Sequence, residues 1–139
     1  MKYKFEKTTE DNYKLTYKDK EFVIKSNVKV ITELQSLVVN ARKKMITELA
    51  KNGSSIKNLT IETKENGKTY YDNSNAKELE KIYQEEATME YFNNKSIELF
   101  NMDLQELLTD IGLETSDEVQ EFTTQLVSCL SGKELTPTK

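Results

Sequence analysis

The sequence predicts an α+β fold, with an N-terminal antiparallel β-meander and an Asn-Gly hairpin packed with a long helix and a C-terminal group of three helices. Three observations lead to this class. Apolar residues alternate with a period of two up to residue 25 and recur every three or four residues from residue 28. Asn66-Gly67 separates two β-rich runs, and helix-capping signatures recur in the second half. The length of 139 residues predicts a single α+β domain over 1–132 and a flexible C-terminal tail over 133–139.

The first three segments alternate apolar and polar side chains, which is typical of strands with one buried face. Asp19-Lys20 is predicted as the loop between the second and third strands, although it lacks the favoured glycine. The alternating apolar positions are Tyr3 and Phe5, then Tyr13, Leu15 and Tyr17, then Phe22 and Ile24.

A helix is predicted over residues 28–51, capped by Asn27 and ended by Asn52-Gly53, whose residues tolerate left-handed backbone. Its apolar residues recur at the helical period along one face. A second apolar row, separated from the first by Gln35 and Arg42, comprises Val28, Val39, Ile46 and Ala50. A helix that is apolar on two sides must be covered on both. Burial within its own fold is the expected arrangement, and contact with another subunit is the alternative.

Asn66-Gly67 predicts a β-hairpin, because both central residues of its turn need positive φ. The flanking strands are predicted as residues 59–63 and 69–71. A two-residue loop places Glu65 opposite Lys68, which is a favourable cross-strand pair. Strand packing is the simpler explanation of Tyr70 and Tyr71, and the alternative is that they lie on an exposed sheet face and bind a partner.

Three capping signatures predict the C-terminal helices. Asn75 with Glu78 opens a helix reaching Phe100, whose apolar residues on most sides predict that it is the central buried helix. Asp103 with Glu106 opens a short helix ended by Gly112. Thr115 with Glu118 opens the last helix, which ends at Ser131-Gly132. Its narrow apolar face comprises Val119, Phe122, Leu126, Cys129 and Leu130.

The chain has no histidine, no tryptophan, one cysteine and one proline, so it offers few catalytic groups. Histidine is the side chain that titrates near neutral pH and is the commonest metal ligand. We therefore expect no enzymatic activity, no cofactor and no metal site. Glu86 and Glu90 lie one helical turn apart, but a di-iron site would need histidine, and salt-bridged or exposed glutamates are the simpler interpretation. Cys129 on an apolar face is interpreted as a small buried hydrophobic residue.

Charge is divided unevenly along the chain. Residues 1–75 carry 15 basic and 10 acidic side chains, whereas residues 76–139 carry 5 and 14, within a net charge of −4. The simpler explanation is that the two parts of the chain form solvated surfaces of opposite charge. The alternative is that oppositely charged ends attract each other in neighbouring copies, which would favour head-to-tail contacts. The basic half lacks a long Lys/Arg cluster, so no nucleic-acid partner is expected. The sequence has neither a membrane-length apolar run nor a signal-peptide pattern, which indicates a cytoplasmic protein without a membrane partner.

Two stretches carry a family resemblance. They are Glu65-Asn66-Gly67-Lys68-Thr69-Tyr70-Tyr71-Asp72-Asn73-Ser74-Asn75 and Leu107-Leu108-Thr109-Asp110-Ile111-Gly112-Leu113. Together with the meander and long helix, they resemble the tail assembly chaperone family of long-tailed phages and prophages of Gram-positive bacteria. The resemblance implies a non-enzymatic protein that self-associates and keeps the helical tape measure protein from aggregating during tail morphogenesis. A longer frameshifted form is often made in that family.

Binding to an amphipathic helical client needs apolar surface between or along helices. The candidate protein-binding residues form two rows, one on each of two predicted helices: Val28, Val39 and Ile46, and Phe122, Leu126 and Leu130. An alternative function is a small acidic phage-encoded inhibitor or decoy that binds a basic host protein. Its acidic residues would be Glu80, Glu85, Glu98 and Glu121. A structural head-tail component is a further alternative.

Overall fold

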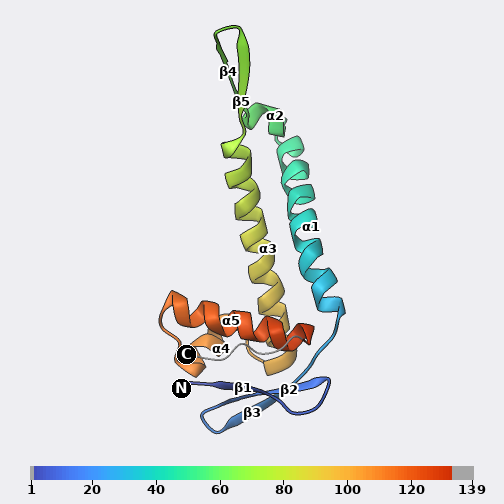
Figure 1. Ribbon diagram of the computed structural model, residues 1–139, viewed down its shortest axis with the longest axis vertical. Helices are drawn as coiled ribbons and strands as arrows, with labels where there is room; N and C mark the ends of the chain where they lie inside the picture. Colours follow the sequence, from blue (N-terminus) through green and yellow to red (C-terminus); the bar gives the residue numbers. More distant parts are fainter. Residues whose placement is uncertain (1, 133–139) are drawn as a thin grey trace. The chain divides into compact units, whose positions relative to one another are not determined.

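The computed structural model describes residues 2–132 and has the predicted mixture of sheets and helices (Figure 1). The predicted α+β class is therefore confirmed. The predicted tail, 133–139, lies outside the described residues. In chain order the elements are β1 (Lys4–Lys7), β2 (Asn12–Tyr17), β3 (Lys20–Lys25), α1 (Lys29–Lys51), α2 (Ile56–Leu59), β4 (Ile61–Glu65), β5 (Lys68–Asp72), α3 (Ser74–Phe100), α4 (Leu104–Ile111) and α5 (Ser116–Ser131).

The chain divides into two units by its internal contacts. The first, here the sheet unit, contains the described residues up to Glu33 and from Tyr91 onward. The second, here the hairpin unit, is Leu34–Glu90. The division falls within α1 and within α3, so both long helices contribute to both units. That residues 1–132 fold as one domain stays a prediction.

The sheet unit contains the predicted meander, with antiparallel strands in the order β1-β2-β3. Five of its seven alternating residues are buried, among them Tyr13, Leu15 and Ile24 completely, whereas Tyr3 and Phe22 are half-buried. The hairpin loop is Lys18-Asp19, because Tyr17 pairs with Lys20. The loop therefore lies one residue earlier in the chain than the predicted Asp19-Lys20. Lys18 supplies the left-handed backbone, with φ of 50°.

Helix α5 packs against β1 and β3 of this sheet (Figure 1). The Phe122 ring contacts the rings of Tyr3 and Phe5, with centroid distances of 5.1 and 5.3 Å. The amide of Asn27 donates a hydrogen bond of 2.8 Å to the carbonyl of Leu130, which ties the end of β3 to the end of α5. The predicted capping box of Thr115 and Glu118 is present. Helix α5 is thus the principal cover of the sheet.

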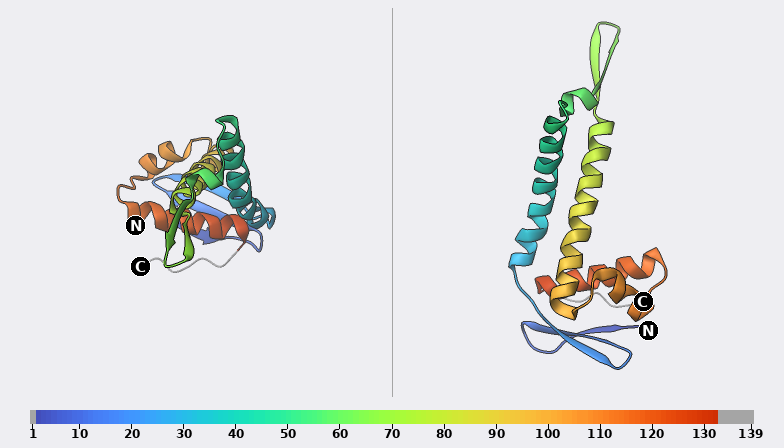
Figure 2. Two further views of the ribbon diagram at one scale, coloured as in Figure 1. Left: turned by 90° about the horizontal axis from the view of Figure 1, so that it is seen from above. Right: turned by 180° about the vertical axis from the view of Figure 1, so that it is seen from behind.

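The hairpin unit places the C-terminal part of α1 beside the N-terminal part of α3, running in opposite directions (Figure 2). The chain passes between them through α2 and the β4-β5 hairpin. Leu59 was predicted to begin a strand but ends the short helix α2 instead, and the strand begins at Ile61. The Thr60 hydroxyl donates 3.1 Å to the carbonyl of Ile56, which stabilises this helical turn.

The β4-β5 hairpin forms as predicted. Asn66 and Gly67 both have positive φ, 52° and 75°, and Glu65 lies opposite Lys68. Positive φ at both central residues is what a type I′ turn requires. Every residue of the two strands is exposed. The hairpin is therefore defined by its turn and its register, without a buried face.

Two predictions for α3 are wrong. The helix begins at Ser74, where the Asp72 carboxylate accepts a 2.9 Å hydrogen bond from the Ser74 amide, so Asn75 is not its cap. The helix is also not buried centrally, because Ile82, Met89 and Ile97 are exposed. In each unit, the elements next to α3 cover only one side of the helix. A helix-period pattern identified the helix correctly but overestimated how much of it is buried.

Candidate protein-binding surface

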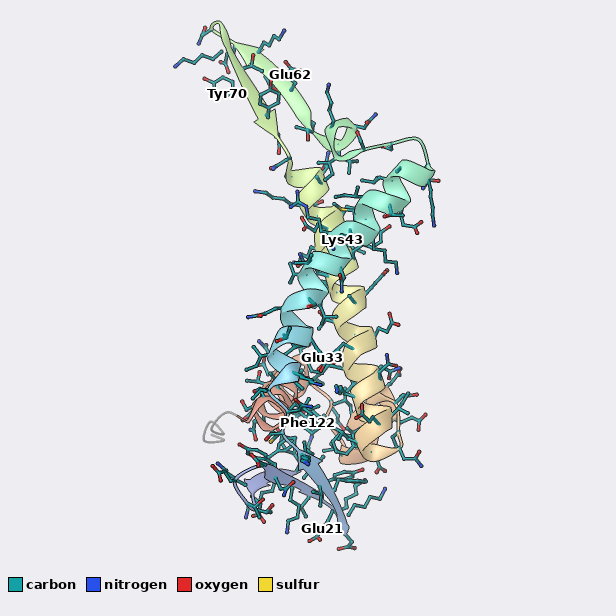
Figure 3. The ribbon with its side chains drawn as sticks, turned by 90° about the vertical axis from the view of Figure 1, so that its right-hand side faces the viewer. Glu21, Glu33, Lys43, Glu62, Tyr70 and Phe122 are labelled. Carbon is teal, nitrogen blue, oxygen red and sulfur yellow. The ribbon has the colours of Figure 1, made fainter. Side chains whose placement is uncertain are left out.

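An exposed row on α1 combines apolar and basic side chains. Val39 and Ile46 are 54% and 44% exposed, and Arg42 and Lys43 lie between them on the same helical face. These four residues are here called the α1 row, and Figure 3 marks Lys43 within it. Internal burial was the expected arrangement for this side of the helix and is wrong. The buried face of α1 consists of other residues: Val30, Ala41 and Met45.

Val28 does not extend this surface within the same unit. It precedes α1 in the sheet unit and is 76% exposed, whereas the α1 row belongs to the hairpin unit. The Asn27 side chain accepts a 2.9 Å hydrogen bond from the Lys29 amide, which confirms the predicted cap. Val28 therefore lies at the start of the helix, one turn from Ile31, which is 37% exposed in the same unit.

Arg42 is held at one edge of the α1 row by an ion pair within the hairpin unit. Its guanidinium lies 3.9 Å from the carboxylate of Glu80 on α3. The Arg42 side chain is 59% exposed, so the pair is solvated and contributes little to stability. The ion pair orients the Arg42 side chain towards Glu80. Lys43 is then the cation of the α1 row that has no ion pair with the described residues.

A second exposed row lies on α3, in the same unit. Ile82 and Met89 are 52% and 62% exposed, with Glu85 and Glu86 between them; these four residues are here called the α3 row. Lys81 lies 4.0 Å from Glu85, a weak pair across one helical turn. The sequence pattern did not identify this row, because it predicted that the whole helix is buried centrally. The doubled glutamate between them was the available signal, since its spacing repeats the α1 row with opposite charge.

The second candidate row is not available to a partner in this structure. Phe122 and Leu126 are completely buried and Leu130 is 3% exposed, because α5 turns this face towards the sheet. The prediction that these three residues bind a partner is therefore corrected: they belong to the core. Cys129 on the same face is also buried, and desolvation raises the pKa of its thiol to about 12. The thiol is protonated at neutral pH, as expected for a packing residue.

Tyr70 and Tyr71 are exposed by 52% and 70% on β5. Successive residues of a strand point to opposite faces, so the two rings do not form one platform. Tyr70 lies opposite Thr63 and Tyr71 opposite Glu62. Figure 3 labels Tyr70 and Glu62 on this hairpin. Each face of the hairpin therefore carries one tyrosine.

An open depression of about 590 Å³ lies in the sheet unit, between the β2-β3 loop and α4. The Tyr17 hydroxyl donates 2.8 Å to Asp110, and the Lys20 ammonium lies 2.6 Å from the same carboxylate oxygen. The hydrogen bond from Lys20 lowers the pKa of Asp110, while burial raises that of Tyr17. Both groups therefore keep their neutral-pH protonation states. This network joins the sheet to α4 and does not supply a group poised for proton transfer.

Within residues 2–132, no group of three or more carboxylate or thiol side chains is arranged to hold a metal ion. None of the helices in the described chain is long and apolar enough to cross a membrane. The sequence matches no model of a known protein family, and no curated protein or solved structure matches it. The α1 row and the α3 row both combine exposed apolar residues with charged residues, which are basic in the first and acidic in the second.

Proposed function

We propose that the chain is a non-enzymatic tail assembly chaperone of a phage or prophage, which binds and shields the helical tape measure protein in the host cytoplasm. The observation that carries this proposal is the α1 row, where Val39 and Ile46 are exposed on a regular helix. The family resemblance of residues 65–75 and 107–113 supports the choice of client.

The α1 row has the spacing that a client helix would need. Val39 and Ile46 are seven residues apart, which is two turns of an α-helix and about 10.5 Å. A client helix with apolar residues at the same spacing would cover both, and full burial of such a side chain is worth about 1.5–3 kcal/mol. Carboxylates beside the client's apolar stripe would lie near Arg42 and Lys43. The preferred client segment is therefore an amphipathic helix with an acidic flank.

The α3 row extends this to a second kind of segment. Its Glu85 and Glu86 favour a client helix whose apolar stripe is flanked by lysine or arginine. A long amphipathic client presents both kinds of flank along its length. Because one unit carries two rows of opposite charge, it could bind the client at segments with either kind of flank.

The test is binding of two designed helical peptides by fluorescence anisotropy, one with glutamate and one with lysine beside the same leucine stripe. The variant Val39→Glu/Ile46→Glu should bind the glutamate-flanked peptide at least about tenfold more weakly, a loss of about 1.4 kcal/mol. The matched variant Ile82→Glu/Met89→Glu should keep this binding. Circular dichroism should show equal helicity in all three proteins, because all four substituted residues are exposed. Equal binding by both variants would contradict the proposal.

The client itself is tested by co-expression with a tape measure protein, where the chain should keep the client soluble and the Val39→Glu/Ile46→Glu variant should not. The acidic inhibitor or decoy is the competing function, and Glu85 and Glu86 favour it. The salt dependence of binding distinguishes the two functions. At about 1 M salt the screening length is only about 3 Å, so binding that depends on exposed charges is weakened. Client binding that persists in high salt supports a chaperone, and binding that is lost there supports the decoy.

A further inference from the structure

We infer that two copies of this chain pair through the outer edge of β5, antiparallel about a two-fold axis at Tyr70, and so join their hairpins into a four-stranded sheet. The inference does not depend on the proposed function, because it involves neither helical row. It rests on the isolation of the hairpin, on its register and on the order of the five side chains of β5.

The β4-β5 sheet has only two strands, and within residues 2–132 no other strand pairs with either of them. All residues of both strands are exposed, including Ile61, Tyr70 and Tyr71. A two-stranded hairpin without a packed face is marginally stable in water. Its two edges also leave unpaired amide and carbonyl groups, which are a template for another strand. The hairpin of a second copy would add a third and a fourth strand, which would pair the edge groups of one strand and stabilise the hairpin.

The register determines which backbone groups of β5 face outward. Glu65 and Lys68 flank a two-residue loop and therefore form a hydrogen-bonded pair. Bonded and non-bonded pairs alternate along an antiparallel ladder, so the amide and carbonyl groups of Thr69 and Tyr71 point away from β4. A two-fold axis at Tyr70 places Thr69 of one copy opposite Tyr71 of the other. The outward groups of the two strands then meet each other.

The side chains match in the same register. Lys68 of each copy lies opposite Asp72 of the other, which gives two opposite-charge pairs from one symmetric contact. Tyr70 lies opposite Tyr70, at the non-bonded position where side chains are closest. Thr69 lies opposite Tyr71, a pairing of a β-branched with an aromatic residue. Each of these cross-strand pairs is of a favourable kind.

The β4 edge is less well matched. A two-fold axis at Thr63 would place Glu62 opposite Lys64, but it would also place the apolar Ile61 opposite the charged Glu65. It would bring together two threonines where β5 brings together two tyrosines. The β5 edge is therefore the one we assign. A contact five residues long is small, so the dimer should dissociate on dilution.

The first test uses proline on the two outer edges and measures mass by sedimentation velocity over a concentration series. Thr69→Pro removes an amide that points outward, so the hairpin's own ladder is kept while the pairing of copies is lost. Lys64→Pro is the matched control, because Lys64 lies opposite Thr69 and its amide points outward from β4. We expect Thr69→Pro to be monomeric and Lys64→Pro to dimerise like the unmodified chain. An unmodified chain that stays monomeric up to about 1 mM, or a dimer lost only in Lys64→Pro, overturns the inference.

The second test exchanges the charges. Lys68→Asp and Asp72→Lys should each be monomeric alone, since each places two like charges opposite each other. An equimolar mixture should dimerise, because every charge then meets its opposite. Both substitutions also act within one copy, as Lys68 lies opposite Glu65 and Asp72 accepts from Ser74. The mixture keeps those internal effects constant, so a mixture that remains monomeric overturns the assigned register.

Discussion

Two hydroxyl groups on α3 are buried without a hydrogen-bond partner in the described structure: those of Tyr91 and Ser96. Ser96 is completely buried in the sheet unit. Burial raises the pKa of the Tyr91 hydroxyl to about 12, so it remains protonated. An unpaired buried hydroxyl costs stability because water no longer satisfies it. At the scale of the single residue, these are the places where the fold is least well satisfied.

Replacing Ser96 with alanine should stabilise the chain, by about 1 kcal/mol, because it removes an unpaired buried oxygen and keeps the backbone helical. Urea unfolding followed by circular dichroism measures this. Ser131→Ala is the control, since the Ser131 hydroxyl donates 2.7 Å to the carbonyl of Val127 and that hydrogen bond would be lost. A Ser96→Ala variant that is less stable than the parent would show that its hydroxyl is satisfied in solution.

At the scale of the element, polar residues at helix ends determine where the helices begin. The Asp103 carboxylate accepts from the Glu106 amide at α4, and Thr115 with Glu118 forms the capping box of α5. Glu118 has a second partner, the ammonium of Lys2 at 2.9 Å. The hydrogen bond from Lys2, followed by one from the Glu114 amide, lowers the pKa of Glu118 to about 2. The start of α5 is therefore tied to the N-terminal segment.

This arrangement predicts a specific loss of stability in acid. The folded-state pKa of Glu118 is depressed from its ordinary value of 4.5, so its contribution is present above pH 4.5 and is lost as the pH falls towards 2. Thermal melts between pH 7 and 2 should show a smaller decrease in this window for Glu118→Gln than for the parent. Lys2→Met should raise the Glu118 pKa, measured by carboxyl-carbon NMR titration. An unchanged Glu118 pKa in that variant would contradict the Lys2 contact.

At the scale of the whole molecule, burial is concentrated in one unit. The buried apolar residues of the hairpin unit are Ala41, Met45 and Ala76, while the remaining core residues belong to the sheet unit. Few buried contacts mean that local opening costs little free energy. The surfaces assigned to client binding and to pairing of copies both lie in the less buried unit. Binding at either surface would therefore add buried contacts to the hairpin unit, which has the fewer buried residues, and would raise its local stability.

Hydrogen exchange measured by mass spectrometry should find faster exchange in peptides from residues 34–90 than in those from β2, β3 and α5. Leu126→Ala should accelerate exchange in the sheet unit, because removing a fully buried leucine costs about 2–5 kcal/mol. At high protein concentration, protection should rise in β5 if copies pair there. Equal protection in the two units of the dilute protein would contradict this distribution of stability.

Local chemistry was sufficient to predict the parts of the fold that depend on adjacent residues. The period of two in the meander, the Asn66-Gly67 turn with Glu65 opposite Lys68, and the caps at Asp103 and Thr115 were all predicted. The ends at Gly112 and Gly132 follow from their left-handed backbone. Each of these features is determined within a few residues, so tertiary contacts did not need to be known.

Which apolar face is covered was decided by the tertiary structure alone. Val39 and Ile46 on one helix, and Phe122 and Leu126 on another, both lie at helical spacings along one face, yet the first pair is exposed and the second is buried. The difference arises because α5 packs on β1 and β3, while no described element covers the α1 row. Periodicity shows that a face is apolar, but its burial depends on elements that are distant in the sequence. The candidate binding surface could therefore be identified only once the packing was known.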